Sequence, residues 1–281
     1  MNAFHIFCSS PFFAKNKGKE LVIDKTEVYC TVLSALSWRE KNGNIAMITD
    51  KEGGKLFRNI GITDIWDSFD NTLTFQNEEI DPVMFWAGGK LIALQKFPAP
   101  CVMIDTDFIV WDKLSFGKKL IAAHEEYLNP SVYPDIATFD MVDYTFPDGL
   151  DYTLAALNTA FLYMPDEDFK QYYTSQAITF MKKAKRGGDY LTYMVFAEQR
   201  LLPMLAKKCG LEYTTLLDKD TLFLPQNSYT HLWGAKQAMR DDEAERERFL
   251  NSCRERIYKS YPDYSYLVDR IESFYGKLSG Q

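Results

Sequence analysis

One stretch near the middle of the chain limits the possible folds more than any other. The apolar run Cys101–Ile104 leads directly into Asp105 and Asp107, and apolar character resumes at Phe108–Val110. Such a run is too short for a helix but long enough for a buried strand of a parallel sheet. In an extended conformation the two aspartates project to one face, at the carboxyl edge where open α/β sheets bind ligands. The stretch therefore predicts an α/β protein with an acidic site at its sheet edge.

A buried pair of carboxylates needs a cation. Mg²⁺ and Mn²⁺ prefer oxygen ligands, and typically bind one or two protein carboxylates together with substrate phosphates and water. The Asp105-x-Asp107 pattern therefore indicates a metal-bridged diphosphate. A three-letter pattern also occurs by chance, so the alternative that Thr106 and Asp107 merely begin a solvated turn stays open from these residues alone.

The chain before this stretch alternates between strands and helices. Three apolar runs predict strands, at residues 3–8, 44–50 and 64–69. A helix is expected after Asp24, a short one after Gly53, and a third from Asp81 to about Phe97. Three strand–helix units followed by an acidic strand end predict a Rossmann-like, mostly parallel sheet flanked by helices.

The second half of the chain continues this pattern and then changes character. Further elements are predicted at 118–123, 157–164, 166–183, 192–207 (interrupted at Pro203) and 222–225, with an ordered loop at 130–149 that could cover a site. From Gln237 onward the sequence is highly charged and helical. We therefore expect an α/β domain at residues 1–236 and a C-terminal helical tail at 237–281.

Polar residues follow the predicted strands and are expected at the same sheet edge. Ser9 follows the first strand, and Asp50 ends the second, where it could hydrogen-bond a nucleoside or cap the next helix. Lys90 follows Gly88-Gly89 inside the third predicted helix. Two helix-interior glycines cost about 1 kcal/mol each relative to alanine, which suggests close approach by another backbone or a ligand. Lys90 could then reach a phosphate; the alternative is a solvated surface lysine.

Composition narrows the class of protein. The net charge is −7, and no cluster of Lys and Arg stands out, which argues against a nucleic-acid partner. Five cysteines without CxxC spacing indicate reduced structural thiols of a cytoplasmic protein. The sequence shows neither a signal peptide nor a run of about 18 apolar residues that would predict a membrane span. Peripheral attachment to a membrane or a partner through the C-terminal helices stays open.

Four groups of residues occur in a characteristic order along the chain: Asp105-Thr106-Asp107, Asn158 opening a later strand, Glu198-Gln199 on a helix, and His231-Leu232-Trp233-Gly234-Ala235-Lys236. In this order and spacing the chain resembles GT-A-fold glycosyltransferases. It looks most like the retaining, metal-dependent branch that includes glycogenin and the bacterial lipopolysaccharide galactosyltransferases. The resemblance covers about residues 3–236 and lies in spaced motifs rather than in continuous sequence.

The resemblance implies a set of metal ligands and donor contacts. Asp105, Asp107 and His231 would bind Mn²⁺ or Mg²⁺, although a lone histidine such as His231 could also be a core residue. Lys236 would neutralise the departing diphosphate, but the lysine of the family usually sits one residue later. The candidate donor-binding residues, from the sheet edge and from the resemblance together, are Ser9, Asp50, Lys90, Thr106 and Lys236.

The resemblance implies roles beside the reacting carbon for three further residues. Asn158 would contact the donor sugar or the acceptor, although the family's companion glycine is Ala160 here. Glu198 would hydrogen-bond the donor sugar or act as a nucleophile, and Gln199 would stabilise the anomeric centre. Adjacent helix positions point about 100° apart, so the two are not expected to touch the same atom. The alternative for Glu198 is a surface glutamate.

The resemblance thus implies a metal-dependent enzyme that moves a hexose from a nucleoside-diphosphate sugar to a hydroxyl of a glycan or glycolipid. UDP and retention of configuration are favoured, and the sugar and acceptor stay open. One alternative is a phosphohydrolase of the haloacid dehalogenase type, with Asp105 as its nucleophile. That motif belongs on the first strand of its domain, which argues against it here. The other alternative is a non-catalytic nucleotide-sugar-binding protein.

Overall fold

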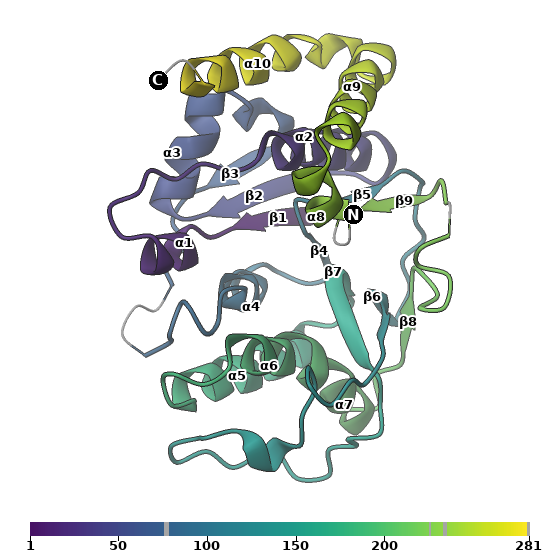
Figure 1. The fold of residues 1–281 in the computed structure, drawn as a ribbon. Coiled ribbons are helices and arrows are strands. Elements are labelled where there is room, and N and C mark those ends of the chain that lie inside the picture. Colours follow the sequence, from purple (N-terminus) through teal and green to yellow (C-terminus); the bar gives the residue numbers. More distant parts are fainter. Residues whose placement is uncertain (76–78, 225, 233–234, 280–281) are drawn as a thin grey trace.

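The computed structural model describes residues 1–75, 79–224, 226–232 and 235–279. A seven-stranded sheet has the order β3-β2-β1-β4-β7-β6-β8, and β5 and β9 form a separate two-stranded sheet (Figure 1). All strands of the large sheet run in one direction except β7, which is antiparallel to both neighbours. The strand bounds are β1 Ala3–Phe7, β2 Ile45–Thr49, β3 Ser68–Asp70, β4 Cys101–Ile104, β5 Phe108–Val110, β6 Leu120–Glu126, β7 Ala156–Met164, β8 Tyr213–Thr215 and β9 Tyr229–His231.

Helices cover both faces of the large sheet, and each face has its own apolar core (Figure 1). One face carries α2 Lys25–Lys41, α3 Lys51–Ile60, α8 Ala235–Asp241, α9 Glu243–Ser260 and α10 Tyr266–Ser279. The other carries α4 Gly88–Lys96, α5 Glu167–Lys183, α6 Tyr190–Val195, a π-helix at Phe196–Arg200 and α7 Leu201–Lys208. Short helical segments complete the described chain: α1 Ser10–Lys15 and 3-10 turns at Thr63–Ile65, Ile136–Thr138 and Pro262–Tyr264. The predicted mostly parallel sheet flanked by helices, with helices at the C-terminus, is confirmed.

The C-terminal helices pack on α2 and α3 rather than standing apart. Leu250, Ile257 and Ile271 are fully buried in the same apolar core as α2. Glu272 on α10 accepts hydrogen bonds from Lys25 (2.6 Å) and Tyr29 (2.7 Å) of α2. The division of the chain at residue 236 stays a prediction. No helix in the described part of the chain is long and apolar enough to cross a membrane.

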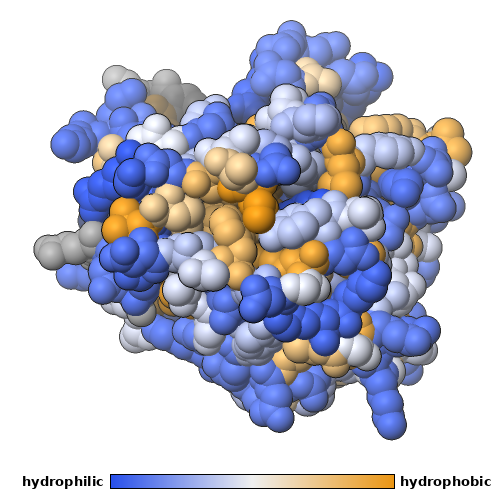
Figure 2. All heavy atoms as spheres, turned by 90° about the horizontal axis from the view of Figure 1, so that it is seen from below, coloured by the Kyte–Doolittle hydropathy of each residue, from blue (hydrophilic) through white to orange (hydrophobic). Residues whose placement is uncertain are grey.

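The predicted loop at 130–149 is ordered and lies on the α5–α6 side of the molecule. Phe139 and Phe146 pack against Phe180 of α5 and Phe196 of the π-helix. Figure 2 views the molecule from below and shows hydrophobic residues gathered among hydrophilic ones. Through these aromatic contacts the loop is part of the apolar core on this side, and it also connects β6 to β7.

The helix predicted from Asp81 begins later, at Gly88. The Asp81 carboxylate accepts from the backbone N–H groups of Val83 and Met84, and residues 82–87 form turns. The two glycines therefore lie in the first turn of α4. A Cβ on Gly89 would lie 2.9 Å from the Cβ of Cys8, so the expected close approach at Gly89 is made by a side chain at the end of β1.

Three other predicted boundaries were wrong. The third strand starts at Ser68, because residues 63–65 form a 3-10 turn. The helix at 192–207 is interrupted by the π-helix, and Pro203 lies within α7. Residues 221–224 form turns and bends rather than an extended segment, and Pro225 lies outside the described residues.

A buried chain of hydrogen bonds ties β1, α2 and β5 together. The Trp66 indole N–H donates to His5 Nδ1 (3.1 Å), so the proton of neutral His5 lies on Nε2 and faces Ser34 Oγ (3.0 Å). Ser34 in turn donates to the carbonyl of Phe108 (2.6 Å). Burial lowers the pKa of His5 to about 3, against the opposing charge of Asp107. A second proton would face the indole N–H, so His5 stays neutral.

Stability is therefore expected to fall as the pH drops below 6.5. The unfolded chain protonates His5 near pH 6.5 and the folded chain does not, so each pH unit between these pKa values costs up to about 1.4 kcal/mol. Urea unfolding between pH 7 and 4 measures this slope. The His5→Gln variant should be less stable at pH 7 and lose this part of the slope. Identical slopes for both proteins would contradict the assignment.

Candidate active site

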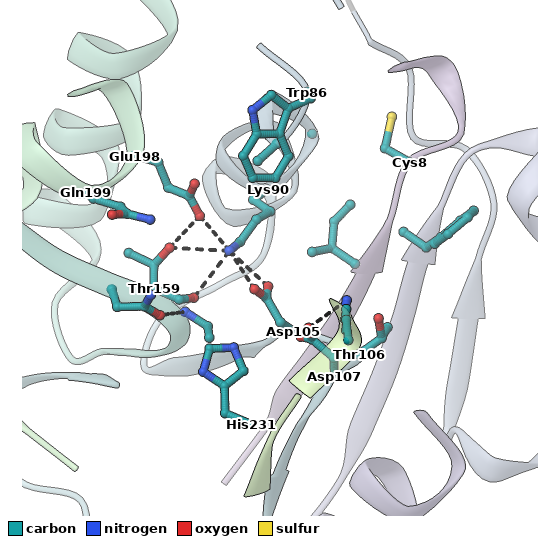
Figure 3. Close-up of a pocket in the computed structure, with 17 residues that line it drawn as sticks. Cys8, Trp86, Lys90, Asp105, Thr106, Asp107, Thr159, Glu198, Gln199 and His231 are labelled. Atoms are coloured by element: carbon teal, nitrogen blue, oxygen red, sulfur yellow. Dashed lines mark hydrogen bonds and ion pairs between the residues drawn. The ribbon is translucent and has the colours of Figure 1, made fainter. Parts of the chain in front are cut away.

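A pocket of about 340 Å³ opens where β1 and β4 end, between the start of α4 and the π-helix. Figure 3 shows the side chains that line it. The structure brings together nine of the eleven residues singled out in the sequence: Lys90, Asp105, Thr106, Asp107, Asn158, Glu198, Gln199, His231 and Lys236. Ser9 and Asp50 are not among its lining residues.

The two aspartates lie in a turn and not in an extended strand, so that part of the prediction was wrong. The N–H of Phe108 donates to the carbonyl of Asp105 (3.0 Å), which turns the chain from β4 into β5. β5 then pairs with β9 so that Phe108 lies opposite His231, and the N–H of Leu232 donates to the carbonyl of Asp107 (3.1 Å). This pairing brings His231, from late in the sequence, to the turn Asp105-Thr106-Asp107, which we call the acidic turn.

Lys90 links two carboxylates inside the pocket. Its Nζ lies 2.9 Å from Asp105 Oδ1 and 2.5 Å from Glu198 Oε1, and Thr159 Oγ1 lies 3.3 Å away. The Lys90 side chain is only 12% exposed. Burial alone would lower its pKa, but the two carboxylates outweigh burial and raise it. Lys90 is thus a charged residue of the pocket and not the solvated surface lysine of the alternative interpretation.

A second lysine holds the other aspartate. Lys236, at the start of α8, lies 2.8 Å from Asp107 Oδ2 and 3.1 Å from Glu27 Oε1 on α2. Burial would raise the pKa of Asp107, but Lys236 and His231 lower it. For Asp105, burial and the nearby Asp107 and Glu198 charges outweigh Lys90 and raise the pKa to about 6. The pocket is therefore short of positive charge at Asp105.

The charges of this network can be counted directly. Four carboxylates, those of Glu27, Asp105, Asp107 and Glu198, surround two ammonium groups, which leaves a net charge of −2 when all six groups are ionised. Burial lowers the pKa of His231 to about 4, so its imidazole is neutral at pH 7. A polyanionic ligand would be repelled by this pocket unless a further cation entered with it.

The donor types suit Mg²⁺ or Mn²⁺, although no preformed cage exists. Among residues 1–75, 79–224, 226–232 and 235–279, no three His, Cys, Asp or Glu side chains are placed to hold a metal ion. Such ions are commonly bound by one or two carboxylates together with substrate phosphates. Asp105 and Asp107 meet that requirement, and neutral His231 lines the same pocket. The residues therefore fit an ion that arrives with a diphosphate.

Glu198 and Gln199 lie on the π-helix, and both line the pocket although adjacent helix positions point well apart. π-helical turns are rare and are often found at functional sites. Glu198 is 2% exposed and accepts from Thr159 Oγ1 (2.5 Å), so it is not a surface glutamate. Gln199 Oε1 accepts from the Tyr133 hydroxyl (2.7 Å).

Asn158 is fixed by its neighbours on β6 and β7. Its amide nitrogen donates to Glu126 Oε1 (2.9 Å) and its oxygen accepts from the Ala160 N–H (3.0 Å). Sequence reasoning missed Glu126, Tyr133 and Thr159. Thr159 follows Asn158 directly, which offered a signal, but nothing in the sequence singles out Tyr133 within its loop.

Ser9 and Asp50 lie outside this pocket and contact each other, and their role in donor binding stays a prediction. The Asp50 carboxylate accepts from the Gly53 N–H (2.9 Å) as the N-cap of α3, and also from the backbone and hydroxyl of Ser9 (2.6 and 2.8 Å). The helix-cap interpretation of Asp50 is therefore confirmed. Trp233 and Gly234 of the late motif lie outside the described residues.

The fold and pocket define a class: an α/β protein with an acidic, lysine-paired pocket at the carboxyl ends of its parallel strands, where such sheets bind ligands. Within that class the chain belongs to the Family of unknown function (DUF6734), whose model matches residues 22–271. Comparison with curated proteins finds no match.

Solved structures of glycosyltransferases resemble the fold distantly. GlyE of Streptococcus pneumoniae TIGR4 is 14% identical, with a TM-score of 0.41, 79% of this chain covered and 46% of GlyE. The chain therefore spans less than half of GlyE. The PaToxG glycosyltransferase is 14% identical (TM-score 0.42; 99% and 86% covered), and the galactosyltransferase LgtC is 11% identical (0.34; 76% and 73%). With TM-scores below 0.5, these similarities carry no conclusion about activity.

Proposed function

We propose that this protein is a metal-dependent glycosyltransferase. Its donor is a nucleoside-diphosphate hexose, with UDP favoured, and its acceptor is a hydroxyl of a glycan or glycolipid. The observation that carries the proposal is the pocket in which Lys90 and Lys236 each pair with one aspartate of the acidic turn. Two ammonium groups beside two hard oxygen ligands suit a diphosphate that arrives with a divalent ion.

Donor binding would rearrange these ion pairs. An ion held by Asp105 and Asp107, with His231 nearby, would compete with both lysines for the aspartates. Lys90 would keep its contact with Glu198, and Lys236 its contact with Glu27, while both ammonium groups turn toward phosphate oxygens. Their charge would then stabilise the diphosphate as the bond to the anomeric carbon breaks. When bound, the ion would add Lewis-acid charge to the same leaving group.

Transfer exchanges one bond for another at the anomeric carbon. The carbon–oxygen bond to the diphosphate breaks with its electron pair going to the diphosphate. The acceptor oxygen bonds to the carbon, and its hydroxyl proton passes to an oxygen of the departing diphosphate. Glu198, oriented by Lys90 and Thr159, would hydrogen-bond the donor sugar or act as the nucleophile of a retaining reaction. Gln199 lies beside it, and Asn158 would contact the donor sugar or the acceptor.

Calorimetric titration with UDP tests the binding step. We expect UDP to bind in the presence of Mn²⁺ and to bind poorly in EDTA, because the pocket alone is negatively charged. Equal binding in EDTA would contradict the metal requirement. Absence of binding under both conditions, together with absence of GDP and TDP binding, would contradict the nucleotide site.

Lys236→Met should separate the affinity for metal from the affinity for nucleotide. Without the lysine, Asp107 is free of its competitor, so Mn²⁺ alone should bind about tenfold more tightly, and UDP with Mn²⁺ about tenfold more weakly. Electron paramagnetic resonance of free Mn²⁺ measures the first change and calorimetry the second. Lys259→Met, at an exposed ion pair on α9, is the matched control. Unchanged Mn²⁺ affinity in Lys236→Met would contradict the competition.

A further inference from the structure

Trp86 is an exposed aromatic residue of the pocket. It belongs to the turn that precedes α4 and lines the pocket, and it is 43% exposed. Figure 3 shows its indole ring beside Lys90, on the side of the pocket away from His231. By contrast, Trp38 and Trp66 are buried in the core. The pocket thus presents a large apolar ring next to its charged network.

The backbone on both sides of Trp86 is anchored. Its neighbours Phe85 and Ala87 are buried, and the Phe85 ring packs edge-on against Phe180 and Tyr193. The Gly88 N–H donates to the carbonyl of Phe85 (2.8 Å), which closes the turn. Tryptophan has only two side-chain torsions, so ordering its ring under a ligand costs little conformational entropy, which favours binding.

The exposure of the side chains along the pocket indicates which kind of ligand would cover the Trp86 ring. Lys90, Glu198 and Thr159, which would meet the donor, are nearly or fully buried. Trp86 is more exposed and is therefore available to a ligand that binds above the donor. The face of a pyranose ring carries C–H groups that pack on an aromatic ring, while its hydroxyls need polar partners such as those nearby.

We propose that Trp86 is the stacking platform for a pyranose ring of the acceptor. This inference rests on the proposed function, and it names the acceptor class as a glycan with a sugar ring near the hydroxyl that is glycosylated. Trp86 is thus a residue that determines acceptor specificity, and the donor is recognised without it.

Kinetic comparison of Trp86→Ala and Trp86→Phe tests the proposal. We expect Trp86→Ala to raise the KM for an accepted glycan about tenfold, and Trp86→Phe to raise it less. The rate of UDP release from the donor without acceptor should change by less than the KM for the glycan does. Tyr258→Ala, which removes an exposed aromatic residue of α9, is the matched control. An equal loss of donor hydrolysis, or an unchanged KM for the glycan, would overturn the acceptor assignment.

A binding measurement keeps the inference testable if no activity is found. Protein labelled with 5-fluorotryptophan gives a ¹⁹F resonance for Trp86, identified by its loss in Trp86→Phe. Lactose, cellobiose and maltose, with UDP and Mn²⁺ present, serve as probes. A shift of the Trp86 resonance with at least one of these sugars is expected; no shift with any of them would overturn the proposal. Failure of the proposed function would instead show as wild-type protein that binds no nucleotide.

Discussion

Replacing Lys90 with methionine is expected to destabilise the protein by about 3 kcal/mol. Removing one partner of a buried ion pair typically costs 3 to 5 kcal/mol, because the remaining charge stays buried without compensation. We expect a loss at the low end of this range, because water can hydrate the partly exposed carboxylate of Asp105. The carboxylate of Glu198 is almost fully buried and would lose its partner. The free energy of unfolding from urea titrations at pH 7 measures the effect.

A double variant separates this charge effect from lost packing. Lys90→Met combined with Glu198→Gln removes both members of the buried pair, so it should recover a good part of the lost stability. If Lys90→Met alone changed stability by less than about 0.5 kcal/mol, the ion pair with Glu198 would not exist in solution.

Replacing either aspartate of the acidic turn with asparagine is expected to reduce sugar transfer about 10²- to 10³-fold. Asparagine keeps the shape of the side chain but lacks the charge that would bind the ion and counter the lysines. The rate of UDP release from the donor, for Asp105→Asn and Asp107→Asn, is the measurement.

The control for this prediction is Asp112→Asn, an exposed aspartate just after β5 that does not line the pocket. It should keep the wild-type rate. Activity within about threefold of wild type in both turn variants would mean that neither carboxylate takes part in catalysis.

Much of the fold could be predicted from the sequence, because the apolar patterns that mark its strands are local. The apolar run Cys101–Ile104 and the first two predicted strands have a clear length, and in the structure each pairs in parallel with a neighbouring strand. Boundaries failed where tertiary contacts decide them. The start of α4 at Gly88 depends on the Asp81 turn and on close packing against Cys8, which lies far away in sequence.

Many of the residues that line the pocket were predictable from the sequence, but their contacts were not. The residue types and their order pointed to Asp105, Asp107 and His231, and the pairing of β5 with β9 brings them to one pocket. The two lysine bridges could not be foreseen, since each joins residues from different elements of the fold. Nor could the π-helix at 196–200, whose residues follow an ordinary helical pattern.

Hydrolysis of nucleotide sugars by the purified protein is the most direct test of the proposed glycosyltransferase activity. A panel of UDP-, GDP- and TDP-hexoses would be incubated with Mn²⁺ or with EDTA, and release of the nucleoside diphosphate followed. We expect slow release of UDP from a UDP-hexose, which requires Mn²⁺ and is lost in Asp105→Asn. Hydrolysis of a simple phosphate ester such as p-nitrophenyl phosphate, with no nucleotide sugar bound or cleaved, would contradict it and favour a phosphohydrolase.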